Sequence, residues 1–251
     1  VASMPAKFED TPIIVAAIDP SFTNGGDRSI VFFGFLGTQD GVQVLQFDSY
    51  VSLSEDINDK ETPRSVQIAR QFKEVCLKKG VLPENAACDA TGAGGPFHDI
   101  LSVEWSPQIL PVNFAGKASE RPVSATDKTP GCDRYANRMS EIWYQGQELL
   151  RSRQLRGIQT DLAKEMVSRR YETSGTNLKI KVESKIDYKS RVGKSPDIAD
   201  AAFIVVDLCR TRHGFMGGER FSVNKGRRQT WENKMKTLDI TAASNRTLLD
   251  T

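Results

Sequence analysis

The feature that most constrains the fold of this chain is a short, uninterrupted apolar run that ends in an acidic residue. Thr11–Asp19 (TPIIVAAID) contains several β-branched residues and is typical of a buried central strand. Ser29–Gly37 and Val42–Val51 predict two more strands, joined by a turn that contains Asp40-Gly41, a common hairpin signal. We therefore expect three consecutive antiparallel strands, the first carrying an aspartate at its end.

From Pro63 onward the pattern changes from hairpins to alternating helices and strands. The spacing of apolar residues predicts helices at Pro63–Lys79 and from Pro96 to about Trp105, with strands at Ala86–Ala90 and Ile109–Phe114. Alternation of this kind produces parallel strands with helices on the faces of the sheet. We expect an α/β protein with a mixed sheet, antiparallel in its first three strands and parallel afterwards.

The second half of the chain predicts three helices and one hairpin. They follow a polar, proline-containing loop, Gly116–Gly131, whose composition gives little reason for rigidity. The expected elements are, in order, a long amphipathic helix from Tyr135 to Leu150, a helix at Ile158–Ser168, a hairpin of Tyr171–Glu172 and Leu178–Val182, and a helix from Ser195-Pro196 to about Arg212. Ser195 is expected to cap the last helix.

Length and composition favour one folded domain with appendages. The chain has 251 residues, of which 39% are hydrophobic and 26% charged, as in ordinary globular proteins. We expect a leader or a vector-derived remnant at residues 1–10, a folded domain at 11–213 and a basic, flexible tail at 214–251. No apolar stretch approaches the ~18–20 residues of a membrane helix, so we expect an intracellular protein without a membrane partner. A net charge of +2 neither indicates nor excludes nucleic acid.

The four cysteines are scattered singly and form no CxxC pair. Cys76 and Cys209 lie on apolar stripes of predicted helices, and Cys88 lies in a predicted strand. We interpret these three as small core residues and expect reduced thiols rather than a zinc site.

Four acidic residues stand where a site could be built. Asp19 and Asp89 both end apolar strands, and the glycine-rich turn Thr91–Gly95 follows Asp89. Asp197 and Asp200 share one face of the first turn of the last helix. Interaction with the helix dipole, worth ~0.3–1 kcal/mol, accounts for Asp197 but not for Asp200, whose neighbours are apolar. We interpret all four as candidate catalytic and metal-binding residues.

Carboxylates without histidine or cysteine specify hard cations such as Mg²⁺ or Mn²⁺. Two such ions ~4 Å apart can hold a scissile phosphate, activate a water molecule and stabilise the leaving oxygen. Hydrolysis of a phosphodiester would then need no protein nucleophile. Asp27, in a Gly-Gly-Asp turn, is a weaker candidate for metal binding, because a role in shaping the loop explains this aspartate better.

Basic residues near these acids are candidate contacts to DNA phosphates. Most of them are in the segment just before Asp197, which we interpret as a loop. The predicted DNA-binding residues are Lys185, Lys189, Arg191, Lys194 and Arg28. A solvated charged surface is an equally good explanation for any one of them taken singly.

Four stretches of the sequence resemble a known family, the C-terminal nuclease domain of large terminase subunits of tailed bacteriophages. The resemblance extends from about Ile13 to Leu208. The stretches are IDPSFTNGGDRS (Ile18–Ser29), CDATGAGG (Cys88–Gly95), the helix containing NRMSEIW (Asn137–Trp143), and the block from Glu183-Ser184-Lys185 through GKSPDIADA (Gly193–Ala201). The last block is the most specific.

The resemblance implies an RNase H-like fold and an endonuclease that cuts concatemeric double-stranded viral DNA during genome packaging. It implies two divalent ions, Mg²⁺ or Mn²⁺, bound at the Asp19, Asp89 and Asp197 positions, with Asp200 replacing or assisting Asp197. It also implies a portal protein and a small terminase subunit as partners, and action in the bacterial host cytoplasm. The family's N-terminal ATPase domain is expected to be absent here, because the chain contains no GxxxxGK[ST] motif.

Other functions are compatible with the same pattern. A junction resolvase or transposase would use the same metal chemistry on a different DNA. An actin-like ATPase also begins with a hairpin and an aspartate, but needs further glycine-rich phosphate segments that are not found. A non-enzymatic docking module for the portal or small subunit would carry the same acids without activity.

Overall fold

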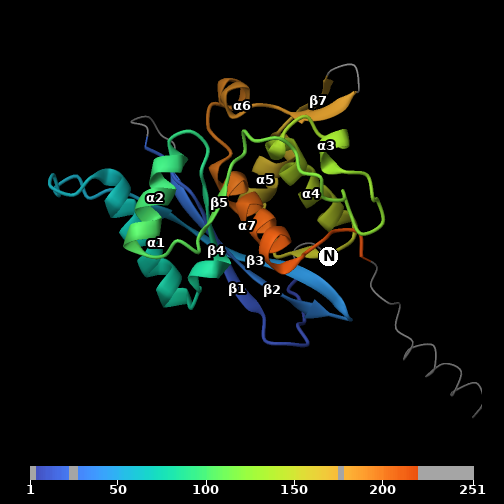
Figure 1. Cartoon of the computed structure of the whole chain (residues 1–251), viewed down its shortest axis with the longest axis horizontal. Helices are drawn as coiled ribbons and strands as arrows, with labels where there is room; N and C mark the ends of the chain where they lie inside the picture. Colours follow the sequence, from blue (N-terminus) through green and yellow to red (C-terminus); the bar gives the residue numbers. More distant parts are fainter. Residues whose placement is uncertain (1–3, 23–27, 175–177, 220–251) are drawn as a thin grey trace, which may run out of the picture. The chain divides into compact units, whose positions relative to one another are not determined.

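The computed structural model describes residues 4–22, 28–174 and 178–219, which form one compact unit up to Glu219 (Figure 1). Its main sheet has six strands in the order β5-β4-β1-β2-β3-β6. The strands are β1 Ile13–Asp19, β2 Ser29–Gln39, β3 Val42–Leu53, β4 Ala86–Asp89, β5 Leu110–Val112 and β6 Leu155–Arg156. β1, β2 and β3 pair antiparallel, whereas β4, β5 and β6 pair parallel with their neighbours, which confirms the expected mixed sheet.

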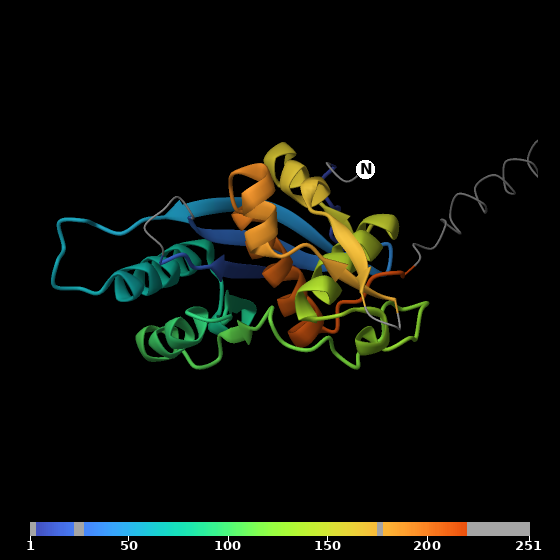
Figure 2. The ribbon, with the colours of Figure 1, turned by 90° about the horizontal axis from the view of Figure 1, so that it is seen from above.

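The helices fall into two groups that lie apart in both ribbon views (Figures 1 and 2). The first group is α1 (Arg64–Lys79) and α2 (Gly94–Glu104). The second contains α4 (Arg138–Arg151), α5 (Thr160–Ser168) and α7 (Asp197–His213). The shorter elements are η1 (Pro83–Asn85), α3 (Gly131–Arg134), α6 (Lys185–Val192) and a hairpin of β7 (Tyr171–Ser174) with β8 (Lys179–Val182).

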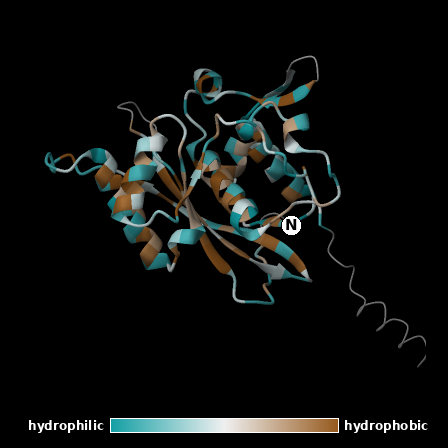
Figure 3. Ribbon diagram, in the orientation of Figure 1, coloured by the Kyte–Doolittle hydropathy of each residue, from teal (hydrophilic) through white to brown (hydrophobic). Residues whose placement is uncertain are grey.

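Each helix group covers one face of the sheet, because successive side chains of a strand point to opposite faces. Ala16 and Ile18 of β1 pack with the buried residues of α1 and α2. Val15 and Ala17 pack in the other core, with α4 and α7. Figure 3 shows the central strands largely in the brown of hydrophobic residues, as expected for strands buried on both faces.

Helix α7 lies directly against the sheet and is buried along most of its length. Its contact with α4 is close, because a Cβ atom added to Gly146 would lie 2.1 Å from the ring of Phe203. Any larger side chain at Gly146 would push α4 away from α7. This packing fixes the position of the helix that carries Asp197 and Asp200.

The predicted helix at Pro63–Lys79 is confirmed as α1, which ends at Gly80 in the left-handed conformation (φ 75°). Cys76, Cys88 and Cys209 are fully buried and free, as expected. Within the described residues, no helix is long and apolar enough to span a membrane.

Three expectations about local structure were wrong. The segment before Asp197 is a helix, α6, capped by Ser184 and ended by Gly193, and not a loop. The loop 116–131 is held in place, with Ala118, Val123 and Ser124 buried. At the start of α7, Pro196 and not Ser195 occupies the N-cap position, and it offers no side-chain acceptor.

The contacts of the described unit include residues that were assigned to the leader and the tail. The amide of Ala6 donates to Gln46 Oε1, and the side chain of Phe8 lies against Gly37. At the other end, Phe215 is buried in the core and Met216 O accepts a hydrogen bond from Gln154. The remainder of the predicted tail, 220–251, lies outside the described residues, as does Asp27.

Candidate metal centre

Asp19 and Asp89 come together because of strand register. β1 and β4 are parallel neighbours, with Ala17 opposite Ala87 and Ile18 opposite Cys88. Ala17 and Ala87 face the α7 side of the sheet, so the residues two positions later on each strand face that side as well. Both strands end at their aspartates. The two carboxylates therefore lie at one edge of the sheet, on the face that α7 covers.

Asp197 and Asp200 reach the same place from α7. Both are in the first turn of the helix, and only 3% and 2% of their surfaces are exposed. Asp19 is buried to a similar degree, with 4% exposed. Three buried carboxylates in one pocket would repel one another strongly, so the site requires positive charge.

The ammonium group of Lys185 provides that charge. Its Nζ atom lies 2.9 Å from Asp19 Oδ2, 3.3 Å from Asp197 Oδ1 and 3.4 Å from Asp200 Oδ2. Lys185 is the first residue of α6, and about a third of its side chain is exposed. Three acids from two distant parts of the chain thus surround one cationic atom at an entrance open to solvent.

Further hydrogen bonds fix the orientation of the α7 acids. Asp200 Oδ1 accepts a hydrogen bond of 2.9 Å from Arg169 Nη1, so its other oxygen faces Lys185. The guanidinium of Arg169 is stacked 4.5 Å from the ring centroid of Trp143, which fixes its own position. Asp197 Oδ2 accepts from the backbone amide of Arg28 at 3.2 Å.

Asp89 completes the group on the open side. Its Oδ1 atom accepts a hydrogen bond from the Thr91 amide at 2.8 Å. It lines, with Lys185, a pocket of about 350 Å³ whose other walls are Pro20, Ser21, Phe22, Thr91, Ala93 and Gly94. The glycine-rich turn therefore forms one wall of this pocket.

The pKa values reflect crowded carboxylates in a poorly solvated place. Burial raises the pKa of Asp19 to about 8; Lys185 opposes this rise, and the charges of Asp200 and Asp89 add to it. Burial also raises the pKa of Asp89, against the hydrogen bonds from Thr91. Such groups gain from a stronger cation than a single ammonium.

The pKa of Lys185 is raised as well, which for a lysine favours the charged form. Burial alone would lower the pKa of its ammonium, but the charges of Asp19, Asp200 and Asp197 outweigh burial and hold that pKa above its ordinary value. Lys185 is therefore a permanent cation in this state. Its displacement requires another cation to neutralise the same acids.

The donor set fits a divalent cation. Oxygen atoms of three carboxylates lie around the Lys185 ammonium, and Asp89 lines a pocket together with Lys185. In the part of the chain that the structure describes, no group of three or more Asp, Glu, His or Cys side chains is arranged to hold an ion directly. Both observations agree if Lys185 stands where an ion would be bound. Carboxylate oxygens are the ligands that Mg²⁺ and Mn²⁺ prefer.

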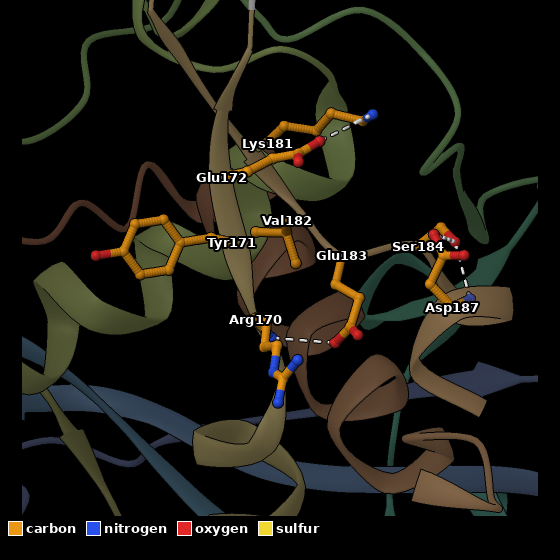
Figure 4. A pocket seen from close by; sticks show the side chains of 8 residues that line it. All are labelled: Arg170, Tyr171, Glu172, Lys181, Val182, Glu183, Ser184 and Asp187. Carbon is orange, nitrogen blue, oxygen red and sulfur yellow. Dashed lines mark hydrogen bonds and ion pairs between the residues drawn. The ribbon is translucent and has the colours of Figure 1, made fainter. Parts of the chain in front are cut away.

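A second pocket, beside the start of α6, is lined by residues that anchor this helix (Figure 4). Glu183 Oε2 accepts from the Arg170 amide at 3.1 Å and from Arg191 Nη2 at 2.6 Å. Ser184 caps α6 by accepting from the amide of Asp187, and the two side chains are also hydrogen-bonded. These bonds attach α6 to the β7–β8 hairpin and place Lys185, the residue after Ser184, over the acids.

The predicted DNA-binding residues have different surroundings. Lys185 is in the acid cluster, and Arg191 binds Glu183 and the carbonyl of Ser168. Lys189 is on α6, and Lys194 lies between α6 and α7. Their role as DNA contacts, and that of Arg28, stays a prediction.

Two residues of the site were missed by the sequence reasoning. Arg169 binds Asp200, and Glu165, which is 2% exposed, accepts a hydrogen bond from the amide of Ala199. Both belong to the helix predicted at Ile158–Ser168 or its end. The spacing of four between a Glu and an Arg was visible, but it is equally typical of an exposed helix face.

The class of fold is that of RNase H-like α/β proteins: three antiparallel strands, then parallel ones, with acids at the ends of adjacent β1 and β4 and on a helix packed across them. The chain is similar in structure to the nuclease domain of the large terminase subunit gp2 of bacterial virus Sf6. That match has a TM-score of 0.54 and 16% sequence identity, and it covers 79% of this chain and 89% of that one.

Two further structures of the same Sf6 domain match as well. Both are variants in which one lysine is replaced by alanine. One was solved with manganese and β-thujaplicinol (TM-score 0.53, 15% identity, 77% and 87% of the two chains) and one with calcium (0.53, 16%, 77% and 87%). No protein-family model matches this chain, and no curated protein matches it.

Proposed function

We propose that this protein is a metal-dependent endonuclease that cleaves double-stranded DNA, of the kind found in terminase large subunits. The observation that carries the proposal is the convergence of Asp19, Asp197 and Asp200 on the ammonium group of Lys185, with Asp89 lining a pocket beside that lysine. The fold shared with the Sf6 nuclease domain, and the manganese and calcium in structures of that domain, support it.

Asp19, Asp89, Asp197 and Asp200 would hold one or two divalent cations in this proposal. Bound there, the cations would polarise the scissile phosphate and lower the pKa of an attacking water. Asp200 is restricted to one oxygen, because Arg169 occupies the other. Asp19 lies 2.9 Å from the Lys185 ammonium, closer than either acid of α7, so its replacement tests the proposed cation site most directly.

Lys185 has two roles in the proposal. In the absence of a divalent cation its single positive charge offsets part of the charge of the three acids. Since its Nζ atom lies at the centre of the carboxylate group, it must move aside when a cation binds. After that movement its ammonium remains beside the pocket, where it would contact the phosphate of the DNA.

The wider setting belongs to the same proposal. The DNA would lie along the open side of the pocket, near Lys189, Lys194 and Arg28, and its phosphates would be held without base specificity. Action in the bacterial host cytoplasm, on concatemeric viral DNA, would follow, with a portal protein, a small terminase subunit and a separate ATPase domain as partners. Cleavage sites would be chosen by these partners.

A cleavage assay with the purified chain tests the proposal. We expect nicking and linearisation of plasmid DNA in Mn²⁺ or Mg²⁺, and none in excess chelator. Asp19→Asn should reduce the rate at least about a hundredfold, since loss of one group that acts on the transition state typically costs that much. The matched control is Asp99→Asn, an exposed aspartate on α2, which should cleave like the parent.

Two results would contradict the proposal. Cleavage by Asp19→Asn at the parental rate would remove the central residue, and full activity in chelator would remove the cation. Cleavage restricted to four-way junctions, with linear duplexes untouched, would favour a junction resolvase with the same chemistry.

A further inference from the structure

The N-cap residue of α7 offers no side-chain acceptor to the first turn of the helix. The first backbone amides of a helix have no partner within the helix and need an acceptor from elsewhere. Ser, Thr, Asp or Asn usually supplies it from the N-cap position. In α7 that position is Pro196, which has no side-chain acceptor. The helix that carries Asp197 and Asp200 therefore depends on another part of the chain.

Glu165, from the middle of α5, supplies the missing acceptor. Its Oε2 atom accepts a hydrogen bond of 2.9 Å from the Ala199 amide. Burial raises the pKa of Glu165, while hydrogen bonds from the amides of Ala199 and Ile198 and the charge of Lys194 oppose that rise. A buried carboxylate with 2% exposure thus faces the N-terminus of α7, where the helix dipole favours negative charge.

The end of α5 makes a second contact with the same turn. Arg169, one turn after Glu165, donates to Asp200 Oδ1 at 2.9 Å. It is itself fixed by the carbonyl of Glu183 and by the ring of Trp143. One short helix therefore holds both the main chain at the start of α7 and the side chain of one of its acids.

We propose that Glu165 is a positioning residue, which caps α7 from a neighbouring helix and so fixes Asp197 and Asp200 for cation binding. The inference rests on the proposed function, because it assumes that these two acids hold a divalent cation. Glu165 touches neither cation nor DNA in this role. Its effect passes through the backbone of Ile198 and Ala199, which lie between the two acids.

Two substitutions that keep the volume of the side chain distinguish the effect of the lost hydrogen-bond acceptor from the effects of lost charge and lost packing. Glu165→Gln keeps a carbonyl oxygen that can accept from Ala199, whereas Glu165→Met keeps the volume and removes the acceptor. The matched control is Gln145→Met on α4. It removes another fully buried polar group, the side-chain amide that donates a hydrogen bond to the Val123 carbonyl. It should destabilise the fold without affecting the start of α7.

Two measurements on the whole chain report on the contact between Glu165 and the start of α7. The first is amide hydrogen exchange at Ile198 and Ala199 without metal; the second is the dissociation constant for Mn²⁺ by calorimetry without DNA. Loss of a cap typically costs about 1 kcal/mol, so Glu165→Met should weaken Mn²⁺ binding and speed exchange about five- to tenfold. Glu165→Gln and Gln145→Met should stay within about twofold of the parent.

Several outcomes would overturn the inference. Parental Mn²⁺ affinity and exchange in folded Glu165→Met would show that the start of α7 needs no cap from α5. If Glu165→Met does not fold, Glu165→Gln decides: a tenfold loss of Mn²⁺ affinity there, with the amides still protected, assigns the effect to charge. Failure of the parent to bind Mn²⁺ would instead contradict the proposed function, while hydrogen exchange would still test the cap.

Discussion

Lys185 is the residue on which the charge balance of the site depends. Its ammonium is within 3.4 Å of three carboxylates, each at most 4% exposed as a residue. A lysine in this position neutralises only one unit of charge, whereas a divalent cation neutralises two. Arg169 offsets a second unit at Asp200, so one negative charge of the three ionised acids is left uncompensated without metal.

Replacement of Lys185 should make the fold depend on metal. We expect Lys185→Met to lower the free energy of unfolding without metal by about 2 kcal/mol, between the values for exposed and buried ion pairs. Because the acids then lack a cation, saturating Mn²⁺ should raise the Tm of Lys185→Met more than that of the parent. Differential scanning calorimetry measures both effects. Lys164→Met, an exposed lysine on α5, is the control, and an equal Mn²⁺ shift in Lys185→Met and parent would contradict the account.

Glu183 gives the protein a stability term that depends on pH. Its hydrogen bonds with Arg191 lower its pKa from 4.5 to about 2. A carboxyl group with a lowered pKa in the folded state stabilises above its unfolded pKa, and this contribution is lost as pH falls through the folded value. We expect Glu183→Gln to be less stable than the parent at pH 7, with a difference that shrinks between about pH 4.5 and pH 2. Urea unfolding at several pH values measures this, and a difference constant over that range would refute it.

The sequence predicted the residues of the site better than their partners. Asp19 and Asp89 could be found because each ends an apolar strand, and strand periodicity then places both on one face. The partner of Asp200 could not be found, because Arg169 reaches it only through the packing of α5 against α7. Lys185 was assigned to DNA because a basic residue beside acids gives no signal of the direction in which its side chain points.

At the scale of elements, a buried ionic cluster joins α4 to α7. Glu141, fully buried, pairs with Arg138 at 2.7 Å and with Arg210 at 3.4 Å, and Arg138 also pairs with Asp207. The amide and hydroxyl of Ser119 donate to the same carboxylate, which attaches the loop 116–131 to this cluster. Composition alone could not show that this polar loop is held in place.

Disruption of this cluster should be far more costly than disruption of a surface pair. We expect Glu141→Gln to lower the free energy of unfolding by about 3–5 kcal/mol, since it removes the anion that pairs with buried Arg210 and one of the two anions that pair with Arg138. Glu148→Gln, which removes the acidic member of the Arg151–Glu148 pair at the surface, should cost less than about 1 kcal/mol. Urea denaturation compares the two, and similar losses for both would contradict the assigned role of the cluster.

The elements that sequence periodicity could not predict are short ones defined by tertiary contacts. β6 consists of Leu155 and Arg156 only, and it exists because both pair with β3. α3 has four residues, too few for a periodic pattern. By contrast α1 has 16 residues, a proline before its first turn and a glycine after its last, so its bounds were predictable.

At the scale of the whole molecule, the topology of the sheet creates the site. β1 is central in the order β5-β4-β1-β2-β3-β6, and β4 is its parallel neighbour, so two strand ends that are 70 positions apart in the sequence meet. α7 then crosses this edge and adds two acids from its first turn. The division into residues 1–10, 11–213 and 214–251 stays a prediction, although contacts of the described unit extend beyond 11–213 on both sides.

The central claim is that Lys185 stands in the binding site of a divalent cation, and a crystal soaked in Mn²⁺ tests it most directly. We predict an anomalous scattering peak between Asp19, Asp89 and the first turn of α7, with carboxylate oxygens at about 2.0–2.5 Å from it and the Lys185 ammonium displaced. An undisturbed Lys185–Asp19 ion pair at saturating Mn²⁺, with no peak among these acids, would contradict the account.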